Sequence, residues 1–210
     1  QYHVSMMTDE LYEINTMGLN VSRILNLKKK TMDHKSMSMA DHSMHNMGGD
    51  MNDDKSSSES MEMMHHKPEV KPTWADPHPT KPFVYVAGNG SDEIIEINTE
   101  KWEITRRFES GKAPYNLEVS HDGKLLVASY KGEGASGIFN LTTGKEVAKI
   151  PNTRKVSHGV TISDDNRFAF VSVEGIGGEP GSVDIIDLKT NKRVNYVETG
   201  KQAGGIIFWK

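Results

Sequence analysis

A fourteen-residue pattern that recurs 43 positions later constrains the fold of this chain more than any other feature. The two copies are residues 117–130 and residues 160–173. Each copy alternates apolar and polar side chains, turns at Asp-Gly or Asp-Asn, and then alternates again, which is typical of a β-hairpin. A unit of this length that holds four antiparallel strands is the blade of a β-propeller. The period therefore predicts an all-β propeller of four-stranded antiparallel blades.

A second pattern supplies the other half of each unit. An apolar strand that ends in a polar turn, followed by another strand, occurs four times. The third strands are predicted within residues 11–16, 94–101, 138–145 and 183–192, and the fourth strands at 21–27, 102–108, 146–150 and 193–197. About four blade units are therefore present. A flat β-meander sheet is the alternative, but the regular period and the Gly-x-x-Pro sequence from Gly111 to Pro114 favour blades.

Alternation within these strands predicts which side chains face the core between blades. We expect a helix of no more than two turns anywhere in residues 82–209. The predicted core positions are Val84, Val86, Ile95, Ile97, Val119, Val127, Ile138, Leu141, Ile162, Phe170, Val183 and Ile186.

Residues 111–130 resemble the repeat of YVTN-type β-propellers, which are also described as YncE-like or surface-layer-like. The resemblance covers residues 81–210 well and residues 2–27 in part, although the second copy lacks the Gly-x-x-Pro sequence. It implies an extracytoplasmic protein, periplasmic or extracellular, and a ring of seven blades. The resemblance is specific for fold and weak for function, because propellers carry many unrelated activities.

The two ends of the chain look complementary. Aligning residues 12–15 with residues 95–98 places Gln1 in the second strand of a blade, whereas residues 204–209 look like a first strand. Either a four-unit ring closes on itself, or the chain is the carboxy-terminal half of a larger propeller, which we favour. Exposed edges at residues 2–7 and 206–209 would then be covered by absent sequence or by another chain.

The segment between residues 31 and 69 has a different composition. It contains no Val, Ile, Leu, Phe, Tyr or Trp, but nine of the twelve Met and five of the nine His. Such a segment cannot bury enough apolar surface to offset its ordering entropy. We therefore expect three parts: a partial blade at 1–30, a disordered Met/His-rich loop at 31–72, and three blades plus a closing first strand at 73–210. The loop should leave the ring near Leu27 and return at a strand near Phe83.

The chemistry of this segment predicts a copper site. Thioether sulfur selects Cu(I), and imidazole binds copper in both oxidation states as well as zinc. The segment resembles the Met/His-rich inserts of periplasmic copper-resistance proteins. Zinc or nickel binding, or an inert linker, are the alternatives. The predicted ligands are Met32, His34, Met37, Met39, His42, Met44, His45, Met47, Met51, Met61, Met63, Met64, His65 and His66.

Other polar residues have weaker patterns. His158, Tyr115 and Asn116 are predicted in loops that lead into first strands and ring one end of a propeller channel, although His158 could simply cap a turn. Asp122 and Asp165 have the position of turn formers rather than of catalytic carboxylates. His78 could approach the metal of the loop. No order of Ser, His and Asp suggests a catalytic triad.

Composition narrows the function further. The chain has 25 basic and 29 acidic residues and no cysteine. These values argue against nucleic-acid partners, disulfides and thiolate metal sites. No apolar run is long enough for a transmembrane segment. We expect a non-enzymatic scaffold that handles copper through the Met/His loop, with other protein subunits or the missing half of the propeller as partners. The alternatives are half of a propeller enzyme or electron-transfer component, and a pure protein-interaction scaffold.

Overall fold

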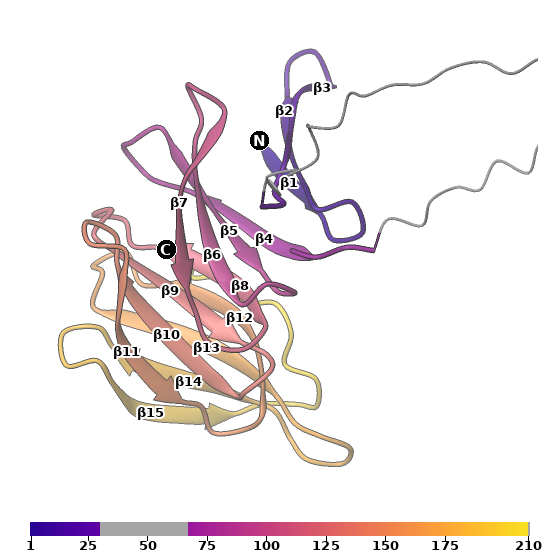
Figure 1. The fold of residues 1–210 in the computed structure, drawn as a ribbon. Coiled ribbons are helices and arrows are strands. Elements are labelled where there is room, and N and C mark those ends of the chain that lie inside the picture. The colour runs from indigo at the N-terminus through magenta and orange to yellow at the C-terminus, as the bar shows by residue number, and fades with distance from the viewer. Residues whose placement is uncertain (30–66, 210) are drawn as a thin grey trace, which may run out of the picture. The chain divides into compact units, whose positions relative to one another are not determined.

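The computed structural model describes residues 1–29 and 67–209, and all regular structure in them is β. Fifteen strands form one three-stranded sheet and three four-stranded sheets (Figure 1), and no helix occurs in these residues. The prediction of an all-β propeller is confirmed. The strands are β1 (Tyr2–Ser5), β2 (Glu10–Asn15), β3 (Asn20–Asn26), β4 (Pro72–Pro77), β5 (Phe83–Gly88), β6 (Glu93–Asn98), β7 (Glu103–Glu109), β8 (Pro114–Val119), β9 (Leu125–Tyr130), β10 (Ala135–Asn140), β11 (Lys145–Pro151), β12 (Val156–Ile162), β13 (Phe168–Glu174), β14 (Ser182–Asp187) and β15 (Lys192–Glu198).

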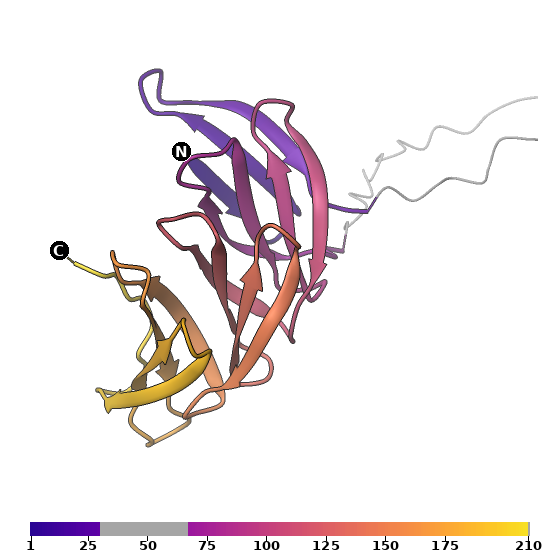
Figure 2. The same cartoon turned by 90° about the vertical axis from the view of Figure 1, so that its left-hand side faces the viewer.

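Every sheet is an antiparallel meander whose strands follow chain order. The successive sheets are β1–β3, β4–β7, β8–β11 and β12–β15, which fan out as separate blades in Figure 2. The register between third and fourth strands shifts at the same place in all four sheets. The shifts fall between Glu13 and Ile14, Glu96 and Ile97, Ile138 and Phe139, and Ile185 and Ile186. A bulge that recurs at one position is a regular structural feature of the repeat. It therefore identifies equivalent residues in the four blades without reference to the side-chain pattern.

Three apolar clusters lie between consecutive blades. Leu11 and Val84 belong to the first cluster, Phe108 and Phe139 to the second, and Ile138 joins the third blade to the fourth. Ten of the twelve predicted core positions are buried. They are Val84, Val86, Ile95, Ile97, Val119, Val127, Ile138, Leu141, Ile162 and Ile186.

Phe170 and Val183 are only half-buried, so their prediction as core residues was wrong. Both side chains lie on the face of the last blade that points away from the third blade. Among the described residues no further blade covers that face. Phe170 instead stacks on Phe208, with ring centroids 6.0 Å apart.

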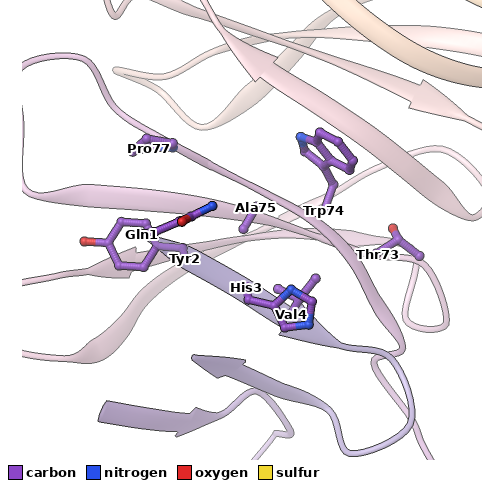
Figure 3. Close-up of a pocket in the computed structure, with 8 residues that line it drawn as sticks. All are labelled: Gln1, Tyr2, His3, Val4, Thr73, Trp74, Ala75 and Pro77. Atoms are coloured by element: carbon purple, nitrogen blue, oxygen red, sulfur yellow. The ribbon is translucent and has the colours of Figure 1, made fainter. Parts of the chain in front are cut away.

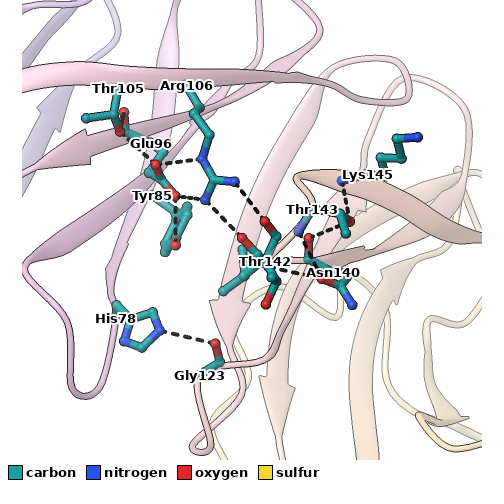
Figure 4. Close-up of polar contacts among 11 residues, drawn as sticks. His78, Tyr85, Glu96, Thr105, Arg106, Gly123, Asn140, Thr142, Thr143 and Lys145 are labelled. Carbon is teal, nitrogen blue, oxygen red and sulfur yellow. Dashed lines mark hydrogen bonds and ion pairs between the residues drawn. The ribbon is translucent and has the colours of Figure 1, made fainter.

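Polar contacts also join the second and third blades (Figure 4). The Arg106 Nε atom donates to Glu96 Oε1 at 2.8 Å, and Arg106 Nη2 donates to the carbonyl oxygen of Leu141 at 2.9 Å. Tyr85 and Thr105 donate to the same carboxylate at 3.1 and 2.7 Å. The Glu96 side chain is 2% exposed. Arg106 neutralises its buried carboxylate and also donates a hydrogen bond to the neighbouring blade.

The chain returns to the propeller earlier than the sequence indicated. Strand β4 begins at Pro72, not near Phe83, and it is the first strand of the second blade. Its prolines at positions 72 and 77 stand at the two ends of the strand, where a missing N–H is tolerated.

The carboxy-terminal segment, residues 204–209, takes the place of a first strand without forming one. Ser172 Oγ donates to the carbonyl oxygen of Gly204, as Ser129 Oγ donates to that of His158 in the preceding blade. The Phe208 N–H donates to Thr161 Oγ1 at 3.0 Å. Residues 204–209 form no strand ladder in the structure. The segment therefore lies where the sequence predicted a first strand, but it is not paired as one.

Candidate functional site

The first strands β4, β8 and β12 lie side by side, and polar side chains gather at both of their ends. At one end, the rings of Tyr115 and His158 lie 4.4 Å apart. The sequence placed these two residues in loops, but both lie inside strands, β8 and β12. The structure therefore corrects the loop assignment and brings the two rings together.

Charged groups flank this pair. The Lys131 Nζ lies 4.4 Å from the centre of the Tyr115 ring, a cation–π distance. His158 Nε2 lies 3.4 Å from Glu174 Oε1. Burial lowers the pKa of His158, Lys131 lowers it further, and Glu174 opposes the change. The imidazole is therefore neutral at pH 7, when it can accept a hydrogen bond or bind a metal.

Asn116 connects two strands. Its backbone N–H donates to Ser129 Oγ at 3.1 Å, and its Oδ1 accepts from the Val160 N–H at 3.3 Å. The side chain is buried and ties β8 to β12. Its role is therefore structural, whereas Tyr115 and His158 keep partly accessible rings.

At the other end, a side-chain oxygen of one first strand accepts a hydrogen bond from a backbone N–H of the next first strand. Asp76 Oδ2 accepts from Val119 N at 2.9 Å, and Glu118 Oε1 accepts from Ile162 N at 3.1 Å. Thr161 repeats this contact with the carboxy-terminal segment. Sequence reasoning missed this set, although a polar residue stands at the second-last position of β4, β8 and β12.

Burial dominates the electrostatics of these carboxyl groups. It raises the pKa of Asp76 to about 7, against the opposing Val119 N–H, and nearby Glu118 adds to the rise. Burial also raises the pKa of Glu118. A carboxyl group with a pKa near 7 can exchange protons at neutral pH. The same hydrogen bonds also link the first strands of neighbouring blades to one another.

His78 is committed to the structure. Its Nδ1 accepts from the N–H groups of Thr80 and Lys81 at 3.1 and 3.0 Å, which leaves Nε2 as the donor to the carbonyl oxygen of Gly123 at 3.1 Å (Figure 4). With both ring nitrogens engaged, the imidazole offers no free lone pair to a metal.

The fourteen predicted copper ligands, from Met32 to His66, lie outside the described residues. Among the described residues, no group of three or more His, Asp or Glu side chains could hold a metal ion. No helix in that part of the chain is long and apolar enough to cross a membrane.

The two ends of the Met/His-rich segment are held at one point. The buried Asp9 carboxylate accepts from the N–H groups of Glu69, Val70 and Lys71 at 2.7, 3.0 and 2.7 Å. On the other side of the segment, Lys28 Nζ lies 3.5 Å from Asp9 Oδ2. Asp9 therefore fastens the residues that precede and follow the segment to the first blade.

The chain is similar in fold to a known enzyme. No known protein family and no curated protein matches the sequence. Among solved structures, Kuenenia stuttgartiensis hydrazine synthase superposes with a TM-score of 0.68 and 15% sequence identity, over 91% of this chain and 44% of that one. This chain thus spans less than half the length of that protein. At this identity the likeness concerns the fold alone, a β-propeller.

Proposed function

We propose that this chain is an extracytoplasmic β-propeller scaffold that binds copper, preferentially Cu(I), through residues 32–66. The observation that carries the proposal is the composition of that segment. Fourteen Met and His side chains fall within it, and no large apolar side chain accompanies them. Thioether and imidazole ligands together match a soft monovalent ion.

The attachment of the segment supports this function. Asp9 holds Lys28 and Glu69, the described residues that flank the segment, against the same blade, so the segment is tethered on both sides. Tethering makes capture of a metal by a second and third donor intramolecular, which raises their effective concentration. The propeller supplies a rigid base, and the described residues contain no competing cluster of ligands.

The test is a competition for Cu(I) between the protein and a chromogenic chelator. Changing Met37, Met39, Met44 and Met47 together to Leu keeps side-chain size but deletes four sulfur atoms. Affinity should fall at least tenfold in this variant, and binding by the remaining His donors should weaken below about pH 6 as imidazole protonates. Each single Met→Leu change should have little effect, because donor sets overlap.

The chain contains its own matched control. Met6, Met7 and Met17 are exposed methionines outside the segment, and changing all three to Leu should leave Cu(I) affinity unchanged. Equal affinity of the wild-type protein and the four-Leu variant would show that the methionines of the segment are not ligands.

A further inference from the structure

Hollows recur between successive blades at the outer rim, which the fourth strands form. The β7–β11 hollow lies between the end of β7 and the start of β11 and has a volume of about 510 Å³. The β11–β15 hollow lies between the end of β11 and the start of β15 and has a volume of about 400 Å³. A larger hollow of about 660 Å³ lies between β1 and β4, but no Lys, Arg, Asp or Glu side chain lines it (Figure 3). Charged side chains line both rim hollows.

The two rim hollows occupy equivalent places in the repeat. The register shift between the third and fourth strands of each blade identifies the equivalent residues. Those with different charges can therefore be compared position by position. Arg107, Glu109, Lys145 and Glu146 of the β7–β11 hollow correspond to Lys149, Pro151, Lys192 and Arg193 of the β11–β15 hollow.

The turn before each fourth strand explains why this place is open. Trp102, Gly144 and Asn191 hold the left-handed position of that turn in successive blades, with φ of 56°, 71° and 55°. Between the first and second blades the Trp102 ring packs against the first blade, and Arg23 Cζ lies 4.3 Å from its centroid. Gly144 and Asn191 are much smaller than tryptophan. The rim hollows therefore arise from small residues at one repeated position.

Charge distinguishes the two rim hollows. The β7–β11 hollow is balanced, because two basic and two acidic side chains line it. In the β11–β15 hollow, Pro151 and Arg193 take the two acidic positions, so three basic side chains and no acidic one line it. A concave surface with charges of one sign raises the local concentration of counter-ions. The β11–β15 hollow is therefore suited to an anionic ligand.

Two of its three basic side chains have unused hydrogen-bonding capacity. Arg193 Nη1 donates to the carbonyl oxygen of Pro151 at 3.2 Å and to Asp184 Oδ2 at 3.3 Å, but its Nε and Nη2 have no acceptor among the described residues. Lys192 is exposed and forms no ion pair with any residue that the structure describes. Lys149 is already engaged, because its Nζ lies 2.9 Å from Glu133 Oε1. Arg193 and Lys192 are thus the groups available to an anion.

The free edge of Arg193 is the edge with which other arginines of this protein bind carboxylates. Arg23 Nε and Nη2 donate to the two oxygens of Glu13 at 2.8 and 2.6 Å. Arg106 presents the same two nitrogens to Glu96. This planar fork matches an oxyanion that offers two oxygen atoms side by side. The adjacent Lys192 adds a second positive charge, which suits a phosphate group with about two negative charges at pH 7.

We propose that the β11–β15 hollow binds a phosphate group, held by the Nε–Nη2 edge of Arg193 and by the Lys192 ammonium. Inorganic phosphate, soluble phosphate monoesters and phospholipid headgroups share this chemistry. The site uses only the third and fourth blades, so it is separate from the Met/His-rich segment and independent of copper binding.

Titration with inorganic phosphate, followed by the NMR resonance of the Arg193 Nε–H group, tests the proposal. Sodium chloride at the same ionic strength is the reference. We expect a saturable shift with phosphate and none with chloride. Lys192→Gln should weaken phosphate binding about tenfold, as the loss of one charge-assisted hydrogen bond implies. Arg193→Lys should also weaken it, because lysine keeps the charge beside Asp184 but lacks the fork.

The β7–β11 hollow supplies the matched control. Lys145 is equivalent to Lys192 and is also exposed, so Lys145→Gln removes the same charge from the balanced hollow and should leave phosphate affinity unchanged. Co-sedimentation with vesicles of phosphatidylcholine, with or without phosphatidic acid, identifies the source of the phosphate group. Binding to phosphatidic acid vesicles that Lys192→Gln weakens and Lys145→Gln does not would support the site and assign it to a headgroup.

Two results would overturn the proposal. One is the absence of saturable binding to both inorganic phosphate and phosphatidic acid vesicles. The other is an equal loss of binding in Lys192→Gln and Lys145→Gln, which would show that phosphate responds to overall charge rather than to the β11–β15 hollow.

Discussion

Replacing Asp76 by Asn should stabilise the protein at high pH and leave its stability almost unchanged at low pH. Burial raises the pKa of Asp76 from 3.8 to about 7. The folded protein therefore holds a proton that the unfolded chain releases above about pH 4. The favourable contribution of the protonated carboxyl is complete below pH 4, is lost progressively as the pH rises, and is gone above about pH 7.

The magnitude follows from the size of the shift. A rise of about three pKa units corresponds to about 4 kcal/mol at 1.36 kcal/mol per unit. Asparagine cannot ionise, and its Oδ1 can still accept from the Val119 N–H, which lies 2.9 Å from the carboxylate in the wild-type protein. We therefore expect the Asn variant to be more stable than wild type by up to about 4 kcal/mol at pH 8, with the difference shrinking toward zero at pH 4.

Urea denaturation followed by circular dichroism, from pH 4 to pH 8, measures this difference. The control is Asp165→Asn on an exposed turn. Hydrogen bonds from Ser163 and Arg167 lower the pKa of Asp165, so its removal should not give stability that grows with pH. If the difference between Asp76→Asn and wild type does not change with pH, or if the variant is less stable at pH 8, the assignment of a protonated Asp76 is wrong.

Three further substitutions test other parts of the fold by the free energy of unfolding. Asp9→Ala should cost about 3–5 kcal/mol, because it leaves three backbone N–H groups without the carboxylate that accepts from them; a cost below 1 kcal/mol would refute the anchoring role of Asp9. Gly123→Ala should cost about 1–3 kcal/mol more than Gly177→Ala. Both glycines have positive φ, 68° and 64°, but only at Gly123 would the new Cβ lie 2.4 Å from His78. Val127→Ala should cost about 2–5 kcal/mol through a cavity in the third cluster, and Phe170→Ala should cost less because Phe170 is half-buried.

The architecture was predictable because it is repeated. A hairpin pattern that recurs after 43 residues, together with four copies of the third strand, needs no tertiary information. Strand β4 was missed because its prolines at positions 72 and 77 are typical of a loop in the sequence. Burial of Phe170 was overestimated because alternation assigns a face to a side chain but does not tell whether a neighbouring blade covers that face.

The polar part of the site was less predictable. Tyr115 and His158 could be placed at one end of the first strands, since they lie at related positions of the repeat. Asp76 and Glu118 carried no motif, because their environment depends on the backbone of the next blade. Asp9 resembles an ordinary turn residue in the sequence, and only the structure shows three N–H groups from a distant segment on its carboxylate.

The central functional claim is that sulfur from the Met/His-rich segment binds copper. X-ray absorption at the copper K edge, on the protein loaded with one equivalent of Cu(I), tests it most directly because sulfur and nitrogen scatter differently. We predict sulfur in the first coordination shell of the wild-type protein and of the variant with Met6, Met7 and Met17 changed to Leu. That sulfur signal should be lost or strongly reduced when Met37, Met39, Met44 and Met47 are changed to Leu. A shell of nitrogen and oxygen alone in the wild-type protein would contradict the claim.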